Sequence, residues 1–319
     1  MDLEQLLFLL SDGEIHSGSE LGLQLEVSRT SIWKAIPNLQ ILGVPVEVVK
    51  GKGYQILGGL DLLNKKNILK LLPQEISNQI NLDVLLSCSS TNDYLARLSK
   101  DFDRSVYDIC LAEHQAAGRG RRGRNWISPF AKNIILSVSF VLGGGVEALS
   151  GLSLVIGLAI AKALEDLGVK NVGMKWPNDV LVADKKIAGI LLELNGEATT
   201  NWRVVCGVGL NVHMLEHEAL EINQDWCSLD ENITCKRDDV AAQIITCLLE
   251  SLDLFKSKGF SCFLENWKQY DILAGKKVSI LPAGIQGVAK GINSNGALLV
   301  DSQGKMHEIN AGEVSVRKS

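Results

Sequence analysis

The apolar positions near the N-terminus repeat at helical spacing. They are Leu3, Leu6, Leu7 and Leu10. Residues three and four apart share one face of a helix, so this run predicts a first amphipathic helix. A second short helix is predicted from Ser19 to Leu25. Ser28 is a good N-cap for a third helix, which ends at Gly43 and buries Ile32, Ile36 and Leu39.

Two short apolar runs follow the third predicted helix. Val44–Val49 and Tyr54–Leu57 flank the sequence Lys-Gly-Lys-Gly, which is typical of a hairpin turn. Helices followed by such a hairpin predict a winged helix-turn-helix. Pro37 lies inside the third predicted helix, where a proline costs about 3 kcal/mol and is expected to kink or end the helix. Gly58–Asn67 is the predicted linker.

After the linker, short apolar runs alternate with longer helical patterns. Strands are predicted at Leu82–Leu86, Val106–His114, Asn133–Leu142 and Leu191–Leu194, and helices at Val146–Leu167, Asp239–Leu254 and Ser261–Tyr270. This alternation predicts a mixed α/β sheet. Its most apolar segment, Leu149–Ala161, falls short of the ~20 residues that a membrane span needs, so it is interpreted as a buried helix.

From Gly275 the chain consists of short β-like runs separated by glycines. The runs are Val278–Leu281, Val288–Ile292, Ala297–Val300, Lys305–Ile309 and Val314–Val316. Short, evenly spaced strands of this kind predict a small SH3-like β-barrel.

Composition excludes several classes of protein. The chain is 46% hydrophobic and 22% charged, as in a soluble globular protein, and its net charge of −5 gives no overall attraction to nucleic acid or membranes. Asp2 and Glu4 precede the first leucines, which does not fit a signal peptide. The seven cysteines form no Cys-x-x-Cys pair and predict reduced thiols in a cytoplasmic protein.

The strongest chemical signal is a run of arginines and glycines, here named the arginine loop (residues 118–126). Arg119, Arg121, Arg122 and Arg124 alternate with Gly118, Gly120 and Gly123. Between Ala117 and Trp126 there is no apolar side chain, so the segment cannot build a core. Glycine lets the backbone approach a ligand closely, and guanidinium groups and amides complement phosphate oxygens.

Three other interpretations fit the loop less well. Its glycines satisfy G-x-G-x-x-G, but that dinucleotide fingerprint must open an amphipathic helix, and Arg-Asn-Trp-Ile-Ser-Pro does not. An RNA-binding arginine–glycine segment is usually longer and does not lie between apolar runs. A plain solvated loop rarely holds four arginines in six residues.

The loop resembles the biotin-binding loop of biotin–protein ligases, in which a Gln precedes a Gly-Arg-Gly-Arg-Arg-Gly-Arg run. Further matches are Ser90-Thr91-Asn92, Lys175-Trp-Pro-Asn-Asp179, Lys186-Ile-Ala-Gly189 and Gly207-x-Gly-x-Asn211. The resemblance covers essentially the whole chain. It implies an α+β protein of three domains. These are a winged helix-turn-helix DNA-binding domain (1–60), a biotin- and ATP-binding catalytic domain whose mixed sheet is like that of class II aminoacyl-tRNA synthetases (68–272), and an SH3-like domain (273–319).

The resemblance also implies which residues hold biotin. They are Ser90, Thr91, Asn92, Gln115, Gly118, Arg119, Gly120, Arg121, Lys186 and Gly189. The ureido ring of biotin has two N–H donors and one carbonyl acceptor, and hydroxyl and amide side chains can both donate and accept. Taken alone, a Ser-Thr-Asn triplet is also common as a helix cap at the end of a strand.

A second implied set lies on the nucleotide side. It comprises Arg121, Arg122, Arg124, Trp126, Lys175, Asn178, Asn211 and Arg317, with Asp179 as a candidate ligand for Mg²⁺. Trp226 lies in a polar segment that is expected to order around adenine. The implied catalytic residues are Lys186, Lys175 and Arg121, because attack of a carboxylate on an α-phosphate brings two negative groups together and cations lower that repulsion. Trp176 has a simpler interpretation as a core residue.

The implied reaction uses biotin, ATP and Mg²⁺ to form biotinyl-5′-AMP, and then biotinylates the carrier protein of acetyl-CoA carboxylase. The family also contains repressors of biotin synthesis genes, which implies operator DNA and an adenylate-promoted homodimer, formed here through the edge of the predicted strand at Gly189–Leu194. The alternatives are a biotin-sensing regulator without ligase activity and a lipoate-type ligase. Retention of Lys175, Lys186 and the full arginine loop favours an active biotin ligase.

The DNA-binding candidates are Arg29, Thr30, Ser31, Lys34, Lys50 and Lys52. Residues 1–60 hold four lysines and arginines against seven acidic residues, a net charge of −3, whereas DNA-binding domains are usually basic. All four positive charges nevertheless fall on the predicted recognition helix and wing, where phosphates would be met. The alternative is a helical interaction module with no role on DNA.

Overall fold

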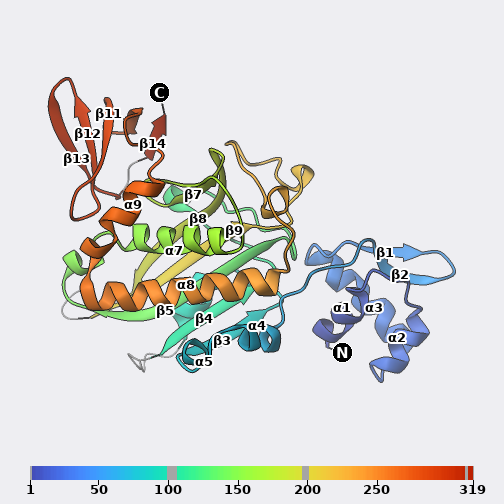
Figure 1. The fold of residues 1–319 in the computed structure, drawn as a ribbon. Helices are drawn as coiled ribbons and strands as arrows, with labels where there is room; N and C mark the ends of the chain where they lie inside the picture. The colour runs from blue at the N-terminus through green and yellow to red at the C-terminus, as the bar shows by residue number, and fades with distance from the viewer. Residues whose placement is uncertain (1, 99–105, 196–200, 313–314, 319) are drawn as a thin grey trace.

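The computed structural model describes residues 2–98, 106–195, 201–312 and 315–318. Within these ranges the strands form three sheets of two, seven and five strands, which follow one another along the chain (Figure 1). The N-terminal unit lies at one end of the seven-stranded sheet, and the C-terminal sheet lies away from it (Figure 1).

The N-terminal unit is a helix-turn-helix followed by a hairpin. Its elements are α1 (Leu3–Leu10), α2 (Gly18–Gln24), α3 (Arg29–Ile41), β1 (Val46–Val49) and β2 (Gly53–Ile56). Each helix is capped by the side chain before it, and the Ser28 hydroxyl accepts from the N–H of Ser31 at 3.1 Å, as predicted. The β1–β2 hairpin projects from the unit (Figure 1). The sequence pattern predicted these elements to within two residues.

Pro37 does not end α3, which continues to Ile41. A proline inside a helix costs about 3 kcal/mol because it removes one hydrogen bond and crowds the preceding turn. Ile36 and Leu39, on either side of Pro37, are 3% and 0% exposed. Burial of each such side chain contributes about 1.5–3 kcal/mol, so packing of this face outweighs the cost of the proline.

The central unit is built on the seven-stranded sheet, in the order β3-β4-β5-β9-β8-β7-β6. Its strands are β3 (Ile80–Leu85), β4 (Tyr107–Ala112), β5 (Asn133–Gly143), β6 (Val172–Lys175), β7 (Asp179–Val182), β8 (Lys185–Asn195) and β9 (Asn201–Asn211). Among the described residues of this sheet, only the β3–β4 pair is parallel, which confirms the predicted mixed sheet. Strand β8 is longer than predicted and includes Lys186.

Helices α4 (Lys65–Leu71), α5 (Gln74–Ser77), α7 (Leu152–Asp166), α8 (Arg237–Lys258) and α9 (Leu264–Tyr270) pack on one face of this sheet. Helix α6 (Thr91–Arg97) lies on the opposite face, where Leu95 packs against Cys110 and Val205. Helices α7 and α8 run side by side across the sheet (Figure 1) and contribute many of the side chains of the main hydrophobic core. Residues 147–166 are long and apolar enough to cross a membrane, but most of them are buried in this core. The predicted buried helix is confirmed.

The helix predicted from Val146 begins later than expected, at Leu152. Val146–Leu149 forms a 3-10 turn, and Gly151 interrupts the helix with φ = +74°. A Cβ at Gly151 would lie 2.2 Å from the ring of Phe260, so only glycine fits this contact. The need for glycine at this break therefore comes in part from a residue more than 100 positions away.

The C-terminal sheet has the order β13-β12-β11-β10-β14. Its strands are β10 (Lys277–Leu281), β11 (Ile285–Ile292), β12 (Leu298–Ser302), β13 (Lys305–Ile309) and β14 (Ser315–Lys318). Val314, predicted to begin the last strand, lies outside the described residues. The Trp176 indole N–H donates to the carbonyl of Gly296 at 2.9 Å, which fixes this sheet to the loop between β6 and β7.

The predicted linker is shorter than expected and is held by hydrogen bonds to the central unit. Helix α4 already begins at Lys65. The N–H of Leu63 donates to Glu113 at 2.6 Å, and the N–H of Asn64 donates to Asp238 at 2.8 Å. Phe130, which follows the arginine loop, packs into the hydrophobic cluster of the N-terminal unit. The two units are therefore fixed to each other close to the arginine loop.

Candidate active site

The predicted site residues surround a cavity of about 740 Å³ above the seven-stranded sheet. Gly189 and Leu191 of β8 and Gly207 and Gly209 of β9 face it, as alternate positions of paired strands must. Every residue predicted to bind biotin or nucleotide lines this cavity, with the exception of Gly118. The lining residues not predicted as site residues include Asn125, Ile127, Trp176, Pro177, Leu191, Gly207, Gly209, Trp226 and residues 221–224.

Two glycines of β9 make room for polar and aromatic neighbours. A Cβ at Gly207 would lie 2.7 Å from the side-chain oxygen of Asn92, and one at Gly209 would lie 2.3 Å from the Trp126 indole. No larger residue fits either position without moving the neighbour. The Gly-x-Gly spacing is thereby explained by side-chain packing across the cavity floor. Gly118 has a similar role at the base of the loop, where a Cβ would lie 2.8 Å from the carbonyl of Trp126.

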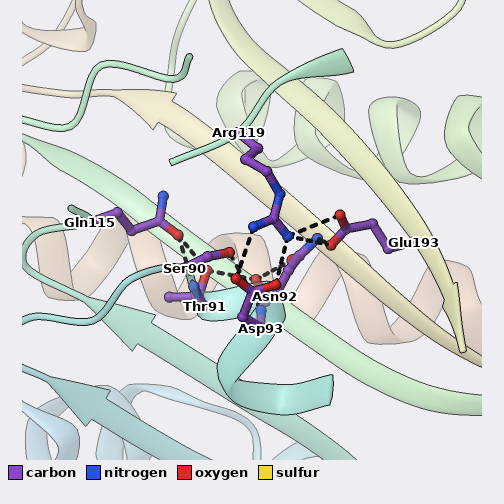
Figure 2. Close-up of polar contacts among 8 residues, drawn as sticks. Ser90, Thr91, Asn92, Asp93, Gln115, Arg119 and Glu193 are labelled. Atoms are coloured by element: carbon purple, nitrogen blue, oxygen red, sulfur yellow. Dashed lines mark hydrogen bonds and ion pairs between the residues drawn. The ribbon is translucent and has the colours of Figure 1, made fainter. Parts of the chain in front are cut away.

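At one end of the cavity, hydroxyl and amide groups form a buried network (Figure 2). The N–H and the hydroxyl of Thr91 donate to Gln115 Oε1 at 2.8 and 3.1 Å. The Ser137 hydroxyl lies 2.7 Å from Thr91 Oγ1 and 2.6 Å from Asn92 Oδ1. Ser90 caps α6. Ser137 was not predicted, because nothing in the sequence of β5 marks it. The network offers both donors and acceptors to a polar ring.

Arg119 extends from the arginine loop toward two carboxylates (Figure 2). Its guanidinium bonds both oxygens of Asp93, at 2.7 and 2.8 Å, and lies 3.0 Å from Glu193 Oε1. The hydrogen bond from Arg119 lowers the pKa of Asp93, so this carboxylate is ionised at neutral pH. Neither acidic residue was predicted.

Arg121 links the arginine loop to two other parts of the chain. It donates to Asn178 Oδ1 at 3.0 Å and to the carbonyl of Gly312 at 2.6 Å, and it also bonds the carbonyl of Ala311. Burial lowers its pKa, because a buried guanidinium loses hydration. A cation with reduced hydration interacts more strongly with an anionic ligand.

Lys186 lies beside Asp179 and Trp126. Its Nζ is 2.8 Å from Asp179 Oδ1 and 5.7 Å from the centre of the Trp126 ring. The segment with Trp226 is fixed to the same lysine, since the N–H of Lys186 donates to Asp225 and its carbonyl accepts from Cys227, both at 3.0 Å. The lysine is 17% exposed and faces the cavity.

The other predicted nucleotide residues are spread around the same cavity. Arg122 and Arg124 are on the loop, Lys175 ends β6, and Arg317 reaches the cavity from β14. Asn211 is 3% exposed and donates to the carbonyl of Cys227 at 3.2 Å, so its side chain also holds the segment beside Lys186.

The described residues contain no cluster of three or more potential metal ligands. At ATP sites Mg²⁺ is typically bound by one or two carboxylates together with the phosphates. Asp179 fits that limited role as a carboxylate in the cavity lining. Its prediction as a metal ligand is not tested by the structure, in which its partner is Lys186.

Comparison with known proteins identifies the family of this chain. Residues 85–211 match the Biotin/lipoate A/B protein ligase family, residues 2–55 an HTH domain, and residues 275–317 the Biotin protein ligase C terminal domain. The bifunctional ligase/repressor BirA of Salmonella typhimurium is 41% identical over 98% of this chain and 97% of its own length. That of Escherichia coli is 40% identical over 99% and 97%. The chain belongs to the biotin protein ligase family.

The structural comparison agrees with this assignment. A biotin protein ligase from Aquifex aeolicus, solved in complex with biotin and ATP, superposes with a TM-score of 0.63 at 29% identity and covers 75% of this chain and 99% of that one. The biotin–[acetyl-CoA-carboxylase] ligase of Mycobacterium tuberculosis is 34% identical over 73% of this chain and 88% of its own length. The HTH match places this protein with the family members that combine a ligase with a repressor.

The DNA-binding candidates are placed where the sequence predicted them. Arg29, Thr30 and Lys34 are exposed on α3, and Lys50 and Lys52 are exposed in the turn of the projecting hairpin. Ser31 is half-buried, and its hydroxyl lies 2.9 Å from that of Ser28. The positive charges of the unit are thus available to a ligand that contacts the recognition helix and the wing.

Proposed function

We propose that this protein activates biotin with ATP and transfers it to a lysine of a biotin carboxyl carrier protein. In the first step a biotin carboxylate oxygen attacks the α-phosphorus of ATP, which gives biotinyl-5′-AMP and releases pyrophosphate. In the second, the carrier lysine amine attacks the acyl carbon, AMP leaves, and an amide forms. No side-chain nucleophile is required, so the protein acts through positioning and charge.

The observation that carries this function is the buried network of Thr91, Asn92, Gln115 and Ser137 at one end of a cavity lined by cations. A ureido ring placed there can satisfy the network with its two donors and one acceptor. The dithiolane ring of lipoate has no such groups and would leave buried polar atoms unpaired, which costs affinity. The network therefore favours biotin over lipoate.

We assign the cations of the cavity to stabilising the negative charge of the transition state. Lys186, Lys175 and Arg121 lie around the place where carboxylate and α-phosphate meet, and the arginine loop excludes water from the mixed anhydride. Asp179 would hold the Mg²⁺ that accompanies ATP, which supplies charge neutralisation on the phosphates. Measuring pyrophosphate release with biotin and with lipoate tests the proposal: release with lipoate alone would replace it by a lipoate ligase.

The finer architecture is part of the same proposal. The boundaries 1–60, 68–272 and 273–319 are supported by the three sheets and by the three matched regions. Likeness of the central sheet to class II aminoacyl-tRNA synthetases, of the C-terminal sheet to an SH3 barrel, and a cytoplasmic location are inferred from the resemblance of the sequence to the family.

Arg121→Ala is expected to speed dissociation of pre-formed biotinyl-5′-AMP about tenfold, with a smaller effect on its synthesis. Arg121 joins the loop to Asn178 and to the carbonyl of Gly312, so its loss frees the loop on the nucleotide side. Removal of hydrogen bonds to a charged group typically costs about 1.5–3 kcal/mol. The measurement is release of labelled adenylate, with Lys268→Ala at an exposed position of α9 as the control. An unchanged release rate would contradict this role.

We further propose an adenylate-promoted dimer that binds operator DNA. Strand β7 pairs with β8 only as far as Gly189, and in the described residues the rest of β8 pairs with β9 alone. An unpaired edge of this kind is a surface on which a second strand can pair. A twofold dimer would present two winged helices to successive turns of a palindrome.

DNA binding is expected to be salt-dependent and to require biotin and ATP. Arg29, Lys34, Lys50 and Lys52 allow up to four phosphate contacts per subunit, each contributing a slope of about −0.9 to log affinity against log salt. A fluorescence titration with the promoter of the protein's own biotin genes measures both effects. Absence of an adenylate-dependent shift at low salt would indicate a ligase without repressor function, and Pro37→Gln would then show whether the proline is responsible.

A further inference from the structure

Three segments distant in the sequence meet at the guanidinium of Arg119. Asp93 comes from the first turn of α6, Arg119 from the arginine loop and Glu193 from β8 (Figure 2). Arg119 and Asp93 are 26 residues apart in the sequence, and Arg119 and Glu193 are 74 residues apart. A bidentate arginine–carboxylate pair fixes distance and orientation at the same time, which a lysine could not do.

Glu193 has a second partner in the biotin network. Its Oε2 accepts from the Asn92 side-chain amide at 2.8 Å, while its Oε1 lies 3.0 Å from Arg119. Asn92 is in turn fixed by the hydroxyl of Ser137. One carboxylate thus connects the loop to a residue of the network that faces the ureido ring.

The charges around Arg119 argue against a main role on the phosphate. Two carboxylates contact one guanidinium, so the group of three has a net charge of −1 before any substrate binds. A negative substrate group gains little from a cation that is already neutralised. The same contacts are well suited to holding the loop in place.

We propose that Asp93 and Glu193 are positioning residues that hold the arginine loop closed through Arg119. These three residues are here named the latch. This proposal rests on the proposed biotin ligase function. It adds that closure of the arginine loop over the biotin end of the cavity depends on acidic residues outside the loop. The latch sets how long biotin and its adenylate remain bound, and Glu193 aligns Asn92 with the ring.

Retention of the adenylate is the first test. Asp93→Asn, Glu193→Gln and Arg119→Met should each raise the dissociation rate of pre-formed biotinyl-5′-AMP about three- to tenfold, equivalent to about 0.7–1.4 kcal/mol. The double variant Asp93→Asn with Arg119→Met should release the adenylate no faster than Arg119→Met alone, because both changes break the same ion pair. Asp93→Glu, which keeps the charge, should recover part of the loss. Glu265→Gln removes an exposed ion pair on α9 and is the matched control.

The second test does not use activity. Without substrate, trypsin should cut the loop at Arg121, Arg122 or Arg124 several-fold faster in Asp93→Asn and Glu193→Gln than in the wild type. High salt should speed cleavage of the wild type and leave Arg119→Met unchanged, since the latch side chains are 31–38% exposed and open to screening. Thermal unfolding of each variant separates a loop effect from loss of fold.

The two proposals fail in different ways. A wild-type protein that forms no adenylate from biotin and ATP overturns the ligase function, whereas faster cleavage in the latch variants would still support the latch. The latch alone is overturned by a different outcome. In that outcome the wild-type protein forms adenylate, and the latch variants match it in adenylate retention, trypsin cleavage and response to salt.

Discussion

Lys186→Met is expected to slow formation of biotinyl-5′-AMP by roughly 100- to 1000-fold, the typical effect of losing one preorganised electrostatic contact, about 2.7–4 kcal/mol in the barrier. Lys186 is 17% exposed and faces the cavity, so its charge acts in a partly desolvated place. Its present partner is Asp179, 2.8 Å away. The substrate carboxylate competes for the same ammonium group as the reaction begins.

The neighbouring lysine provides a matched control. Lys185 precedes Lys186 on β8, pairs with Glu231 at 3.7 Å, and is 54% exposed outside the cavity. Lys185→Met should therefore leave pyrophosphate release close to that of the wild type. Circular dichroism checks that both variants are folded. If Lys186→Met forms adenylate at a rate near that of Lys185→Met, the assigned role of Lys186 is wrong.

Glu113→Gln is expected to destabilise the protein by about 3–5 kcal/mol, because it leaves a buried cation without its partner. Arg237 is 0% exposed, and its Nη1 lies 2.6 Å from Glu113 Oε2. The other oxygen of Glu113 accepts from the N–H of Leu63 in the linker. Arg237 also donates to the carbonyl of Asp61 at 2.8 Å. The change should loosen both the sheet and the attachment of the N-terminal unit.

Urea unfolding measures this effect. Because whole domains are typically stable by only about 5–15 kcal/mol, the variant should lose a large part of its stability. Glu265→Gln, which breaks an ion pair whose side chains are 68% and 80% exposed, should change stability by about 0–1 kcal/mol. A loss below about 1 kcal/mol in Glu113→Gln would mean that the pair at Arg237 is replaceable.

The sequence by itself predicted the elements of the N-terminal unit, several of the later strands and helices, and many of the residues that line the cavity. Ser28 caps α3 because its hydroxyl reaches an N–H three residues away, and Leu6, Leu7 and Leu10 of α1 are buried because they share one helical face. These signals involve only neighbouring residues, so they can be recognised without a fold. The motifs likewise marked most of the cavity wall, because hydroxyls, amides, arginines and lysines have fixed chemistry wherever they lie.

Only the tertiary structure decided which of these groups act together. Asp93 and Glu193 are unremarkable acidic residues in the sequence, and they meet Arg119 only because α6, the loop and β8 converge. The ring of Phe260 leaves room only for glycine at the break before α7, and continuation of α3 past Pro37 depends on what Ile36 and Leu39 pack against. Each result depends on contacts between distant segments. The strength of these contacts is set by packing and strand register, which cannot be predicted from a local sequence pattern.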